Sequence, residues 1–304
     1  MTKTYLEMNM KSRPLLCLAI VLFSTTASAQ DAGTVDRAKA SGSITMGVRE
    51  SSAPLSYTLG GEKFVGYHVE LCERVLSTLV PRAVIKYFPV TSQNRIPLLQ
   101  NGTVDIECGS TSNTAARKQQ VAFAVTTYVT EARFVVKTSS EITSAEQLAG
   151  KTVVTTTGTT HVQRLRKLTA DKGVTFDLIY GKDHADSFLL VESGRADAFA
   201  MDDNTLAGLV ANSKNPRDYQ IVGKPLGVEP IAIMIRKNDT AFKAAVDQAI
   251  KGMMSSGELE KLYAKWFLGP IPPHNAIVGI PMGESLKAAF ATPNDDPAEA
   301  YENK

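Results

Sequence analysis

Two hydrophobic patterns alternate along the chain from residue 43 onward. Short apolar or alternating runs are typical of strands, and longer segments with apolar residues every three or four positions are typical of helices. The first pattern predicts strands at 43–48, 83–90, 104–108, 151–157, 178–181, 196–201, 219–222 and 231–236, and an extended stretch at 128–136. The second predicts helices at 68–80, 93–100, 161–173, 187–195, 204–212, 240–255 and 258–267. Because strands alternate with helices, the predicted class is α/β with largely parallel sheets.

The strand–helix units form two sets, one before about Thr130 and one from 151 to 222. Extended segments at 128–136 and 219–229 lie between these sets. We therefore expect two lobes joined by two hinge crossings, with the chain returning to the first lobe. The expected bounds are 30–130 plus 228–280 for lobe 1, 131–227 for lobe 2 and 281–304 for a C-terminal tail. The end of this tail is rich in proline and polar residues, so we expect it to be disordered.

The first 29 residues predict a secretory signal peptide. Lys11 and Arg13 precede an apolar run too short to span a bilayer, and Ala27-Ser28-Ala29 has the form of a cleavage site before Gln30. This leader carries the whole formal net charge of +2, so the mature chain is neutral. A neutral chain argues against nucleic acid as a partner.

One segment, Thr91–Arg117, combines a helix, a turn, a buried strand and a polar loop. Ser92 is placed to cap the helix, and Asn101-Gly102 end it. Two arginines and three hydroxyls flank the single strand, which is more anion-binding donors than a packed core needs; they are Arg95, Arg117, Ser92, Ser110 and Ser112. The segment therefore predicts one wall of a site for a small carboxylate.

Other polar residues also follow predicted strands, where ligands bind in open α/β sheets. Arg49 follows 43–48, Thr160 and His161 follow 151–157 at a helix N-terminus, His184 follows 178–181, and Asp202 follows 196–201. A helix N-terminus favours an anion because of its unpaired amides and its dipole. These strand ends are expected to complete the site.

The balance of residue types indicates which ligand fits. Three arginines, several hydroxyls and a helix N-terminus favour negative charge, whereas Asp202 could hold an ammonium. Arginine binds carboxylates bidentately and keeps its charge when desolvated. A ligand with two carboxylates and one ammonium matches this set best. An uncharged ligand side chain would leave a buried arginine unpaired, at a cost of about 2–5 kcal/mol.

Each of these residues also has a purely structural interpretation. Arg49 alone would be taken for a solvated surface residue, and Ser92 for a helix cap. His184 could cap a helix or pair with a neighbouring aspartate. Asp202 could be a helix cap, in competition with Asp203. The functional interpretation is favoured because five strand ends carry suitable donors and one carries an acid.

Two cysteines remain after the leader, Cys72 in a predicted helix and Cys108 in a buried strand. An exported protein can hold a disulfide. Two small buried thiols explain the same residues equally well, and the sequence leaves both possibilities open.

The chain resembles a known family at several motifs. SQNRIPLLQNGT, ECGSTSN, KDHADSF with ESGRA, MDD, IVGKP, KWF and IPPHN match the glutamate/aspartate-binding proteins of bacterial periplasmic amino-acid uptake systems. The resemblance implies a monomeric, two-lobed periplasmic-binding-protein fold of type II, with each lobe a central sheet flanked by helices. It implies that the lobes close around glutamate or aspartate in the periplasm and deliver it to an ABC permease of the inner membrane, with no cofactor.

The resemblance also implies roles for the strand-end residues. The ligand α-carboxylate would bind Arg117 with help from Ser112 and Thr160. The ammonium would bind Asp202 and the Ser110 region. The side-chain carboxylate would meet a third group, namely Arg49, Arg95, Ser92 and His184. Ser112 stands where the family often has threonine, which keeps the hydroxyl.

Two other functions are considered. A periplasmic dehydratase or lyase on this scaffold would need an acid or base in the cleft. The candidates are Glu107, His184 and Glu50, but strand alternation predicts that Glu107 faces away from the site. A receptor's sensing module is disfavoured because no membrane or signalling segment follows the two lobes.

Overall fold

The computed structural model describes residues 1–5 and 33–301, and the structural statements below refer to these residues. Residues 1–5 are exposed and have no regular secondary structure. The rest of the predicted signal peptide, including its cleavage site, lies outside the described residues.

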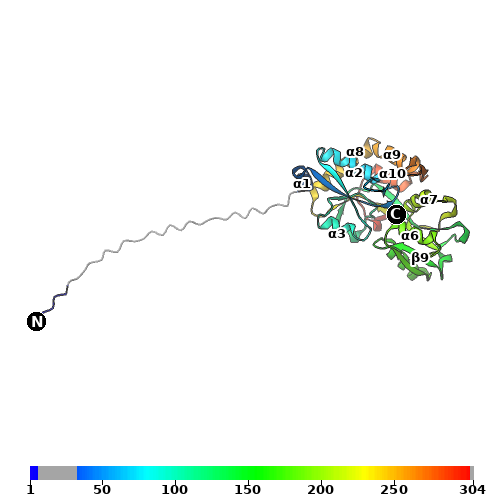
Figure 1. The fold of residues 1–304 in the computed structure, drawn as a ribbon, viewed down its shortest axis with the longest axis horizontal. Helices are drawn as coiled ribbons and strands as arrows, with labels where there is room; N and C mark the ends of the chain where they lie inside the picture. Colours follow the sequence, from blue (N-terminus) through cyan, green and yellow to red (C-terminus); the bar gives the residue numbers. More distant parts are fainter. Residues whose placement is uncertain (6–32, 302–304) are drawn as a thin grey trace. The chain divides into compact units, whose positions relative to one another are not determined.

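The first lobe is built on a five-stranded sheet in the order β5-β1-β6-β14-β7. β1 runs parallel to β5 and β6, and β14 runs antiparallel to β6 and β7. The strands are β1 (Ser43–Val48), β5 (Val84–Pro89), β6 (Ile106–Glu107), β7 (Val121–Phe123) and β14 (Met234–Arg236). The accompanying helices are α1 (Thr34–Ser41), α2 (Tyr67–Leu79), α3 (Arg95–Gln100), α4 (Ala115–Lys118), α8 (Thr240–Ser255), α9 (Glu258–Tyr263), a π-helical turn (Ala264–Leu268) and α10 (Glu284–Ala291). Figure 1 shows α2, α8, α9 and α10 gathered together, where they share one core with β1.

The second lobe is built on a sheet in the order β10-β9-β11-β8-β12. Its strands are β8 (Tyr128–Lys137), β9 (Thr152–Thr156), β10 (Asp177–Gly181), β11 (Ala198–Asp202) and β12 (Tyr219–Val222). Its α-helices are α5 (His161–Lys172), α6 (His184–Glu192) and α7 (Asp203–Asn212), and its 3₁₀ turns are Thr138–Ser140, Ala145–Leu148 and Pro216–Asp218. Two apolar clusters fill this lobe, one with Leu165 of α5 and one with Phe188 of α6.

Two antiparallel strands connect the lobes. β8 pairs through its first residues with β13 (Val228–Ile231) and through the remainder with β11 and β12. The chain thus enters the second sheet through β8 and returns to the first sheet through β13 and β14. This confirms the predicted α/β class and the two crossings. The predicted single strand at 231–236 is wrong, because β13 pairs with β8 whereas β14 pairs with β6 and β7.

Two small sheets were not predicted. One contains β2 (Ser51–Ser52), β3 (Ser56–Thr58) and β4 (Phe64–Val65), and the other contains β15 (Pro270–Ile271) and β16 (Ala276–Ile277). Strands of two or three residues are too short to show a reliable alternation.

The end of the chain differs from the prediction of disorder. Its backbone pairs with the first lobe, because the Thr126 amide donates to the Asn294 carbonyl at 2.8 Å and the Ala298 amide donates to the Asn113 carbonyl at 2.8 Å. A last short helix, α11 (Ala298–Tyr301), follows. The polar composition suggested disorder, but long-range partners satisfy this backbone. Residues 302–304 lie outside the described residues.

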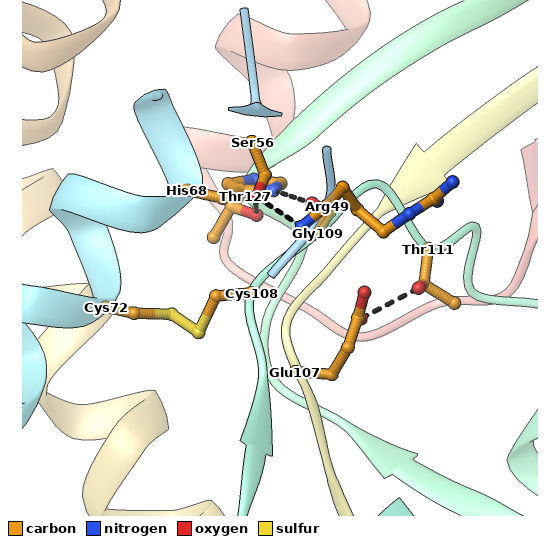
Figure 2. Close-up of a disulfide and its surroundings, with 9 residues drawn as sticks. All are labelled: Arg49, Ser56, His68, Cys72, Glu107, Cys108, Gly109, Thr111 and Thr127. Carbon is orange, nitrogen blue, oxygen red and sulfur yellow. Dashed lines mark hydrogen bonds between the residues drawn. A yellow bond between two sulfur atoms is a disulfide. The ribbon is translucent and has the colours of Figure 1, made fainter. Parts of the chain in front are cut away.

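A disulfide joins α2 to the segment that follows β6, which resolves the open question about the cysteines. The Cys72 and Cys108 sulfurs are 2.01 Å apart, and both residues are buried. One turn earlier in α2, His68 Nδ1 lies 2.5 Å from the Gly109 carbonyl oxygen, and its Nε2 lies 2.9 Å from Thr127 Oγ1 (Figure 2). Burial lowers the pKa of His68 to about 4, so the ring is neutral and Nδ1–H donates to Gly109. Helix α2 therefore holds the loop after β6 at two adjacent positions.

Candidate functional site

Three arginines meet where the two lobes face each other, and we call them the arginine cluster: Arg49, Arg95 and Arg117. Arg49 follows β1, Arg95 begins α3, and Arg117 lies in α4 after the β6 loop. Arg49 is 0% exposed and Arg95 is 2% exposed. All three are close enough for the charge of one to affect the others. The predicted convergence of strand-end arginines is therefore present in the structure.

Arg49 connects the lobes through an ion pair. Its Nη2 lies 2.5 Å from Asp183 Oδ1, and Asp183 precedes α6 of the second lobe. The Ser51 hydroxyl donates to Asp183 Oδ2 at 2.9 Å. Burial opposes ionisation of Asp183, but the Arg49 charge, His184 and the hydrogen bonds from the Ser51 hydroxyl and the His184 amide together outweigh it and lower the pKa of Asp183 to about 2. Asp183 is thus a charged link between the lobes, a role that the sequence pattern does not indicate.

His184 supports Arg49 from the second lobe. Burial, and then the Arg49 charge, lower the pKa of His184 to about 3, so the ring is neutral. Its Nε2 lies 3.3 Å from Arg49 Nη2, and its Nδ1 lies 2.9 Å from Thr156 Oγ1. Arginine can only donate, so Nε2 accepts and Nδ1 carries the hydrogen. This contact brings His184 next to the arginine cluster, and its predicted contact with the ligand stays a prediction.

The other two arginines are fixed by backbone carbonyls. Arg95 Nη1 donates to the Ser110 carbonyl at 3.1 Å. Arg117 donates to the Ser112 carbonyl at 3.0 Å and, across the lobes, to the Gly158 carbonyl at 3.2 Å. Burial, and then the neighbouring Arg117 charge, lower the pKa of Arg95 well below its ordinary value. The charged form of Arg95 is therefore disfavoured by its surroundings, and a bound anion would stabilise it.

Serine residues of the β6 loop connect these arginines. Ser110 Oγ donates to Ser52 Oγ at 3.1 Å and lies 3.5 Å from Arg49 Nη1. Ser110 and Ser112 are each 3% exposed. The loop thus places the buried Ser110 hydroxyl beside Arg49 and the Ser112 carbonyl beside Arg117.

Three further predicted residues have buried polar atoms without a hydrogen-bond partner among the described residues, namely Ser92 Oγ, Thr160 Oγ1 and Asp202 Oδ1. The prediction that Ser92 caps its helix is wrong. α3 begins at Arg95, and the Asn94 side chain accepts from the Thr91 amide at 2.8 Å instead. Thr160 and Asp202 occupy N-cap positions of α5 and α7 without capping through their side chains. Their polar atoms therefore remain available at the site.

A glycine allows the two lobes to approach closely beside Ser92. Gly158, between β9 and α5, has φ of +81°, and a Cβ placed there would lie 2.7 Å from Gln93 Cα and 2.8 Å from Ser92 C. Any side chain would collide with this backbone. Gly158 thus permits both the turn and the contact between lobes.

Glu107 lies on the side of the arginine cluster, which corrects the prediction that it faces away. A Cβ on Gly109 would lie 2.2 Å from Glu107 Oε1 and 2.7 Å from Arg49 Cγ, so both side chains flank this glycine. Thr111 Oγ1 donates to Glu107 Oε2 at 2.8 Å, as Figure 2 shows. β6 is only two residues long, so strand alternation does not extend past Glu107. The buried carboxylate partly balances the arginines.

A second missed acid, Glu229 of β13, is fully buried. Arg164 of α5 donates through Nε to Glu229 Oε1 at 2.5 Å. Burial opposes its ionisation, but the Arg164 charge and the hydrogen bonds from Arg164 and Ser112 lower the pKa of Glu229. Glu229 also acts electrostatically on Arg117. No motif marked it, because its partner is distant in the sequence.

Among residues 1–5 and 33–301, no three His, Cys, Asp or Glu side chains gather in a way that could hold a metal ion. No helix in this part of the chain is long and apolar enough to cross a membrane.

Two lobes joined by paired strands, with buried arginines and hydroxyls between them, define a solute-binding protein. The chain belongs to the family of bacterial extracellular solute-binding proteins, family 3, whose model matches residues 44–269.

Individual relatives are similar over nearly the whole chain. An L-glutamate/L-aspartate-binding protein of Pseudomonas aeruginosa is 44% identical, over 94% of this chain and 97% of its own length. A glutamate/aspartate import solute-binding protein of Escherichia coli is 41% identical, over 95% and 99% of the two chains. An ancestral arginine-binding protein solved with arginine is 28% identical with a TM-score of 0.68, over 74% of this chain and 98% of that one. These comparisons confirm the predicted family and the two-lobed fold, and relatives at this identity are binding proteins rather than enzymes.

Proposed function

We propose that the protein binds glutamate, aspartate or both in the cleft between its two lobes and delivers the amino acid to an ABC permease of the inner membrane. The observation that carries the proposal is the arginine cluster, in which Arg49 Nε and Arg95 Nε are buried without a hydrogen-bond partner among the described residues. Its relatives from two bacteria are named for the same ligands.

Two groups of residues would each bind one of the ligand's two carboxylates. The α-carboxylate would bind Arg117, the Ser112 hydroxyl and the Thr160 hydroxyl. The side-chain carboxylate would bind the second group, namely Arg49, Arg95, Ser92 and His184. The unpartnered Nε groups of Arg49 and Arg95 and the Ser92 hydroxyl support this assignment. In the described arrangement His184 Nε2 accepts from Arg49, so His184 would act there mainly by orienting that guanidinium.

The ammonium of the ligand would bind Asp202, with help from Ser110. Asp202 is 1% exposed, and its Oδ1 has no hydrogen-bond partner among the described residues. A buried carboxylate of this kind is stabilised by a cation. This role also explains why Asp202 does not cap α7.

Ligand binding would accompany closure of two lobes with the bounds predicted from the sequence. Lobe 1 would comprise 30–130 and 228–280, lobe 2 would comprise 131–227, and the tail would begin at 281. β8 and β13 would form the hinge, since they carry the only chain passages between the two sheets among the described residues. The mature protein would act as a periplasmic monomer after removal of the predicted signal peptide.

An enzymatic function is less well supported. Glu107 accepts from Thr111, and His184 is held between Arg49 and Thr156. These contacts suit electrostatic support better than proton transfer.

The proposal is tested by a thermal-shift panel of the twenty amino acids on the mature protein, followed by isothermal titration calorimetry. We expect glutamate and aspartate to raise the melting temperature most and to bind at micromolar concentration or below, without product formation. Absence of binding by both acidic amino acids would overturn the proposal.

A further inference from the structure

His161 is a buried histidine that the proposed site does not yet use. It is the first residue of α5, directly after Thr160, and it is 0% exposed. Neither ring nitrogen has a hydrogen-bond partner among the described residues. Burying such a group without a partner destabilises a protein, so its presence calls for an explanation.

The other two buried histidines show what a structural role looks like. His68 contacts the Gly109 carbonyl and the Thr127 hydroxyl, and His184 contacts the Thr156 hydroxyl and Arg49. In both, each ring nitrogen lies within hydrogen-bond distance of a polar atom. His161 lacks such partners and therefore differs from an ordinary core histidine.

The nearest charged atom to His161 for which a contact is found belongs to Asp202. His161 Nε2 lies 3.4 Å from Asp202 Oδ1, and both side chains are almost completely buried. This separation is slightly longer than a normal hydrogen bond, so the two groups are adjacent but not yet fully engaged. Because a carboxylate only accepts, the contact is favourable when Nε2 carries a hydrogen.

Two further titratable groups act on His161 from neighbouring elements. Glu229 of β13 interacts with it electrostatically, and so does His184 of α6. Glu229 is already bonded to Arg164, and His184 is neutral and bonded to Thr156. Asp202 is therefore the acid with an unpartnered oxygen that lies in direct contact with His161.

We propose that His161 is a positioning residue for Asp202. The hydrogen on Nε2 would hold Oδ1, so that the remaining lone pairs of the carboxylate face the ligand ammonium. This inference rests on the proposed function, in which Asp202 binds that ammonium. It predicts that His161 contributes to the binding of ligands with an amino group and not to the binding of dicarboxylates without one.

The test compares His161→Phe, which removes the donor but keeps a ring, with His161→Gln, which restores a donor. Gln163→Ala is the matched control, because Gln163 is exposed and lies two residues further along α5. Calorimetry measures L-glutamate, and displacement of L-glutamate measures glutarate, which is the same dicarboxylate without the amino group. Melting temperatures of the ligand-free variants check that each is folded.

We expect His161→Phe to weaken glutamate binding by about tenfold, the effect of losing one hydrogen bond to a charged group. His161→Gln should recover most of this loss, Gln163→Ala should bind as the wild type does, and glutarate affinity should stay unchanged. If glutarate binds the wild type too weakly to measure, the comparison of ligands is replaced by a comparison of variants in the Asp202→Asn background. In that background His161→Phe should then have no further effect on glutamate binding.

Any of three results would overturn the inference while leaving the proposed function intact. The first is wild-type glutamate affinity in His161→Phe. The second is an equal loss of affinity for glutamate and glutarate, and the third is a loss that adds to that of Asp202→Asn, since each of these two would mean that His161 acts on closure or folding. Failure of the wild type to bind either glutamate or aspartate would instead refute the proposed function itself.

Discussion

The two lobes contribute different kinds of groups to the site. The first lobe supplies the arginine cluster, and Arg95 and Arg117 are bonded to carbonyls of the loop that follows β6. The second lobe supplies buried polar groups with unpartnered atoms, namely Thr160, His161 and Asp202. Buried atoms without a hydrogen-bond partner among the described residues also occur on Arg49, Arg95 and Ser92 of the first lobe. The two lobes therefore differ in the type of group that each supplies, guanidinium groups in the first and a carboxylate with helix N-termini in the second.

The two lobes also differ in the contacts that hold their site residues in place. In the first lobe, α2 holds the β6 loop through the disulfide and His68, and the C-terminal segment holds it through Asn113. In the second lobe, the site residues lie at the starts of α5 and α7. We infer that the first lobe captures the anionic ligand and that closure of the second lobe completes its recognition.

The largest effect is expected from Arg117→Ala, because this side chain would hold the carboxylate that all amino acids share. Affinity for acidic and neutral amino acids alike should fall by about 2–5 kcal/mol, since a desolvated charge loses its partner. Calorimetry measures the loss, and Gln119→Ala, an exposed neighbour, is the control. A loss confined to glutamate and aspartate would show that Arg117 binds the side chain instead.

A smaller effect is expected from Asp183→Asn, which removes the ion pair between Arg49 and the second lobe. Closure should become less favourable by roughly 1–3 kcal/mol, the range for a hydrogen bond between charged groups. Stopped-flow kinetics should show faster ligand release. Unchanged release would mean that this pair does not hold the lobes together.

The same pair predicts a pH dependence of stability. The pKa of Asp183 is lowered to about 2, so its contribution is present above its ordinary value near 3.8 and is lost as pH falls from there toward 2. The wild type should therefore lose more stability than Asp183→Asn over that range, as measured by urea unfolding. Parallel losses in the two proteins would contradict the assignment.

Truncation after Pro293 is also expected to reduce glutamate affinity, because Asn294–Tyr301 pairs with Asn113 and Thr126 next to the β6 loop. Glutamate affinity should fall by about tenfold as the loop that carries Ser112 and Arg117 loses its support. Removal of residues 302–304 alone is the control. Equal glutamate affinity in both truncated proteins would show that this segment does not support the binding site.

The smallest effect on affinity is expected from the double substitution of Cys72 and Cys108 by serine. The disulfide should contribute about 2–4 kcal/mol to the free energy of unfolding. Glutamate affinity should fall only slightly, because His68 still holds the Gly109 carbonyl. Loss of glutamate binding in a folded double variant would show that the disulfide, rather than His68, holds the β6 loop in its binding conformation.

The sequence predicted the elements and the convergence of Arg49, Arg95 and Arg117 because parallel strands bring their carboxyl ends to one edge whatever lies between them. It did not predict contacts that depend on distant partners. Asp183 meets Arg49 across a separation of 134 residues, and the C-terminal backbone meets Asn113. The prediction that Glu107 faces away from the site is wrong because β6 is only two residues long, too short for alternation to define which face of the sheet Glu107 occupies. Such partners follow from the packed fold, which local patterns do not specify.

The most direct test of the central claim is the ratio of glutamate to glutamine affinity in the wild type and in Arg95→Ala. If Arg95 binds the side-chain carboxylate, the substitution should abolish most of the wild-type preference for glutamate while leaving glutamine binding nearly unchanged. An unchanged glutamate preference in Arg95→Ala would contradict the claim that the arginine cluster selects an acidic amino acid through this residue.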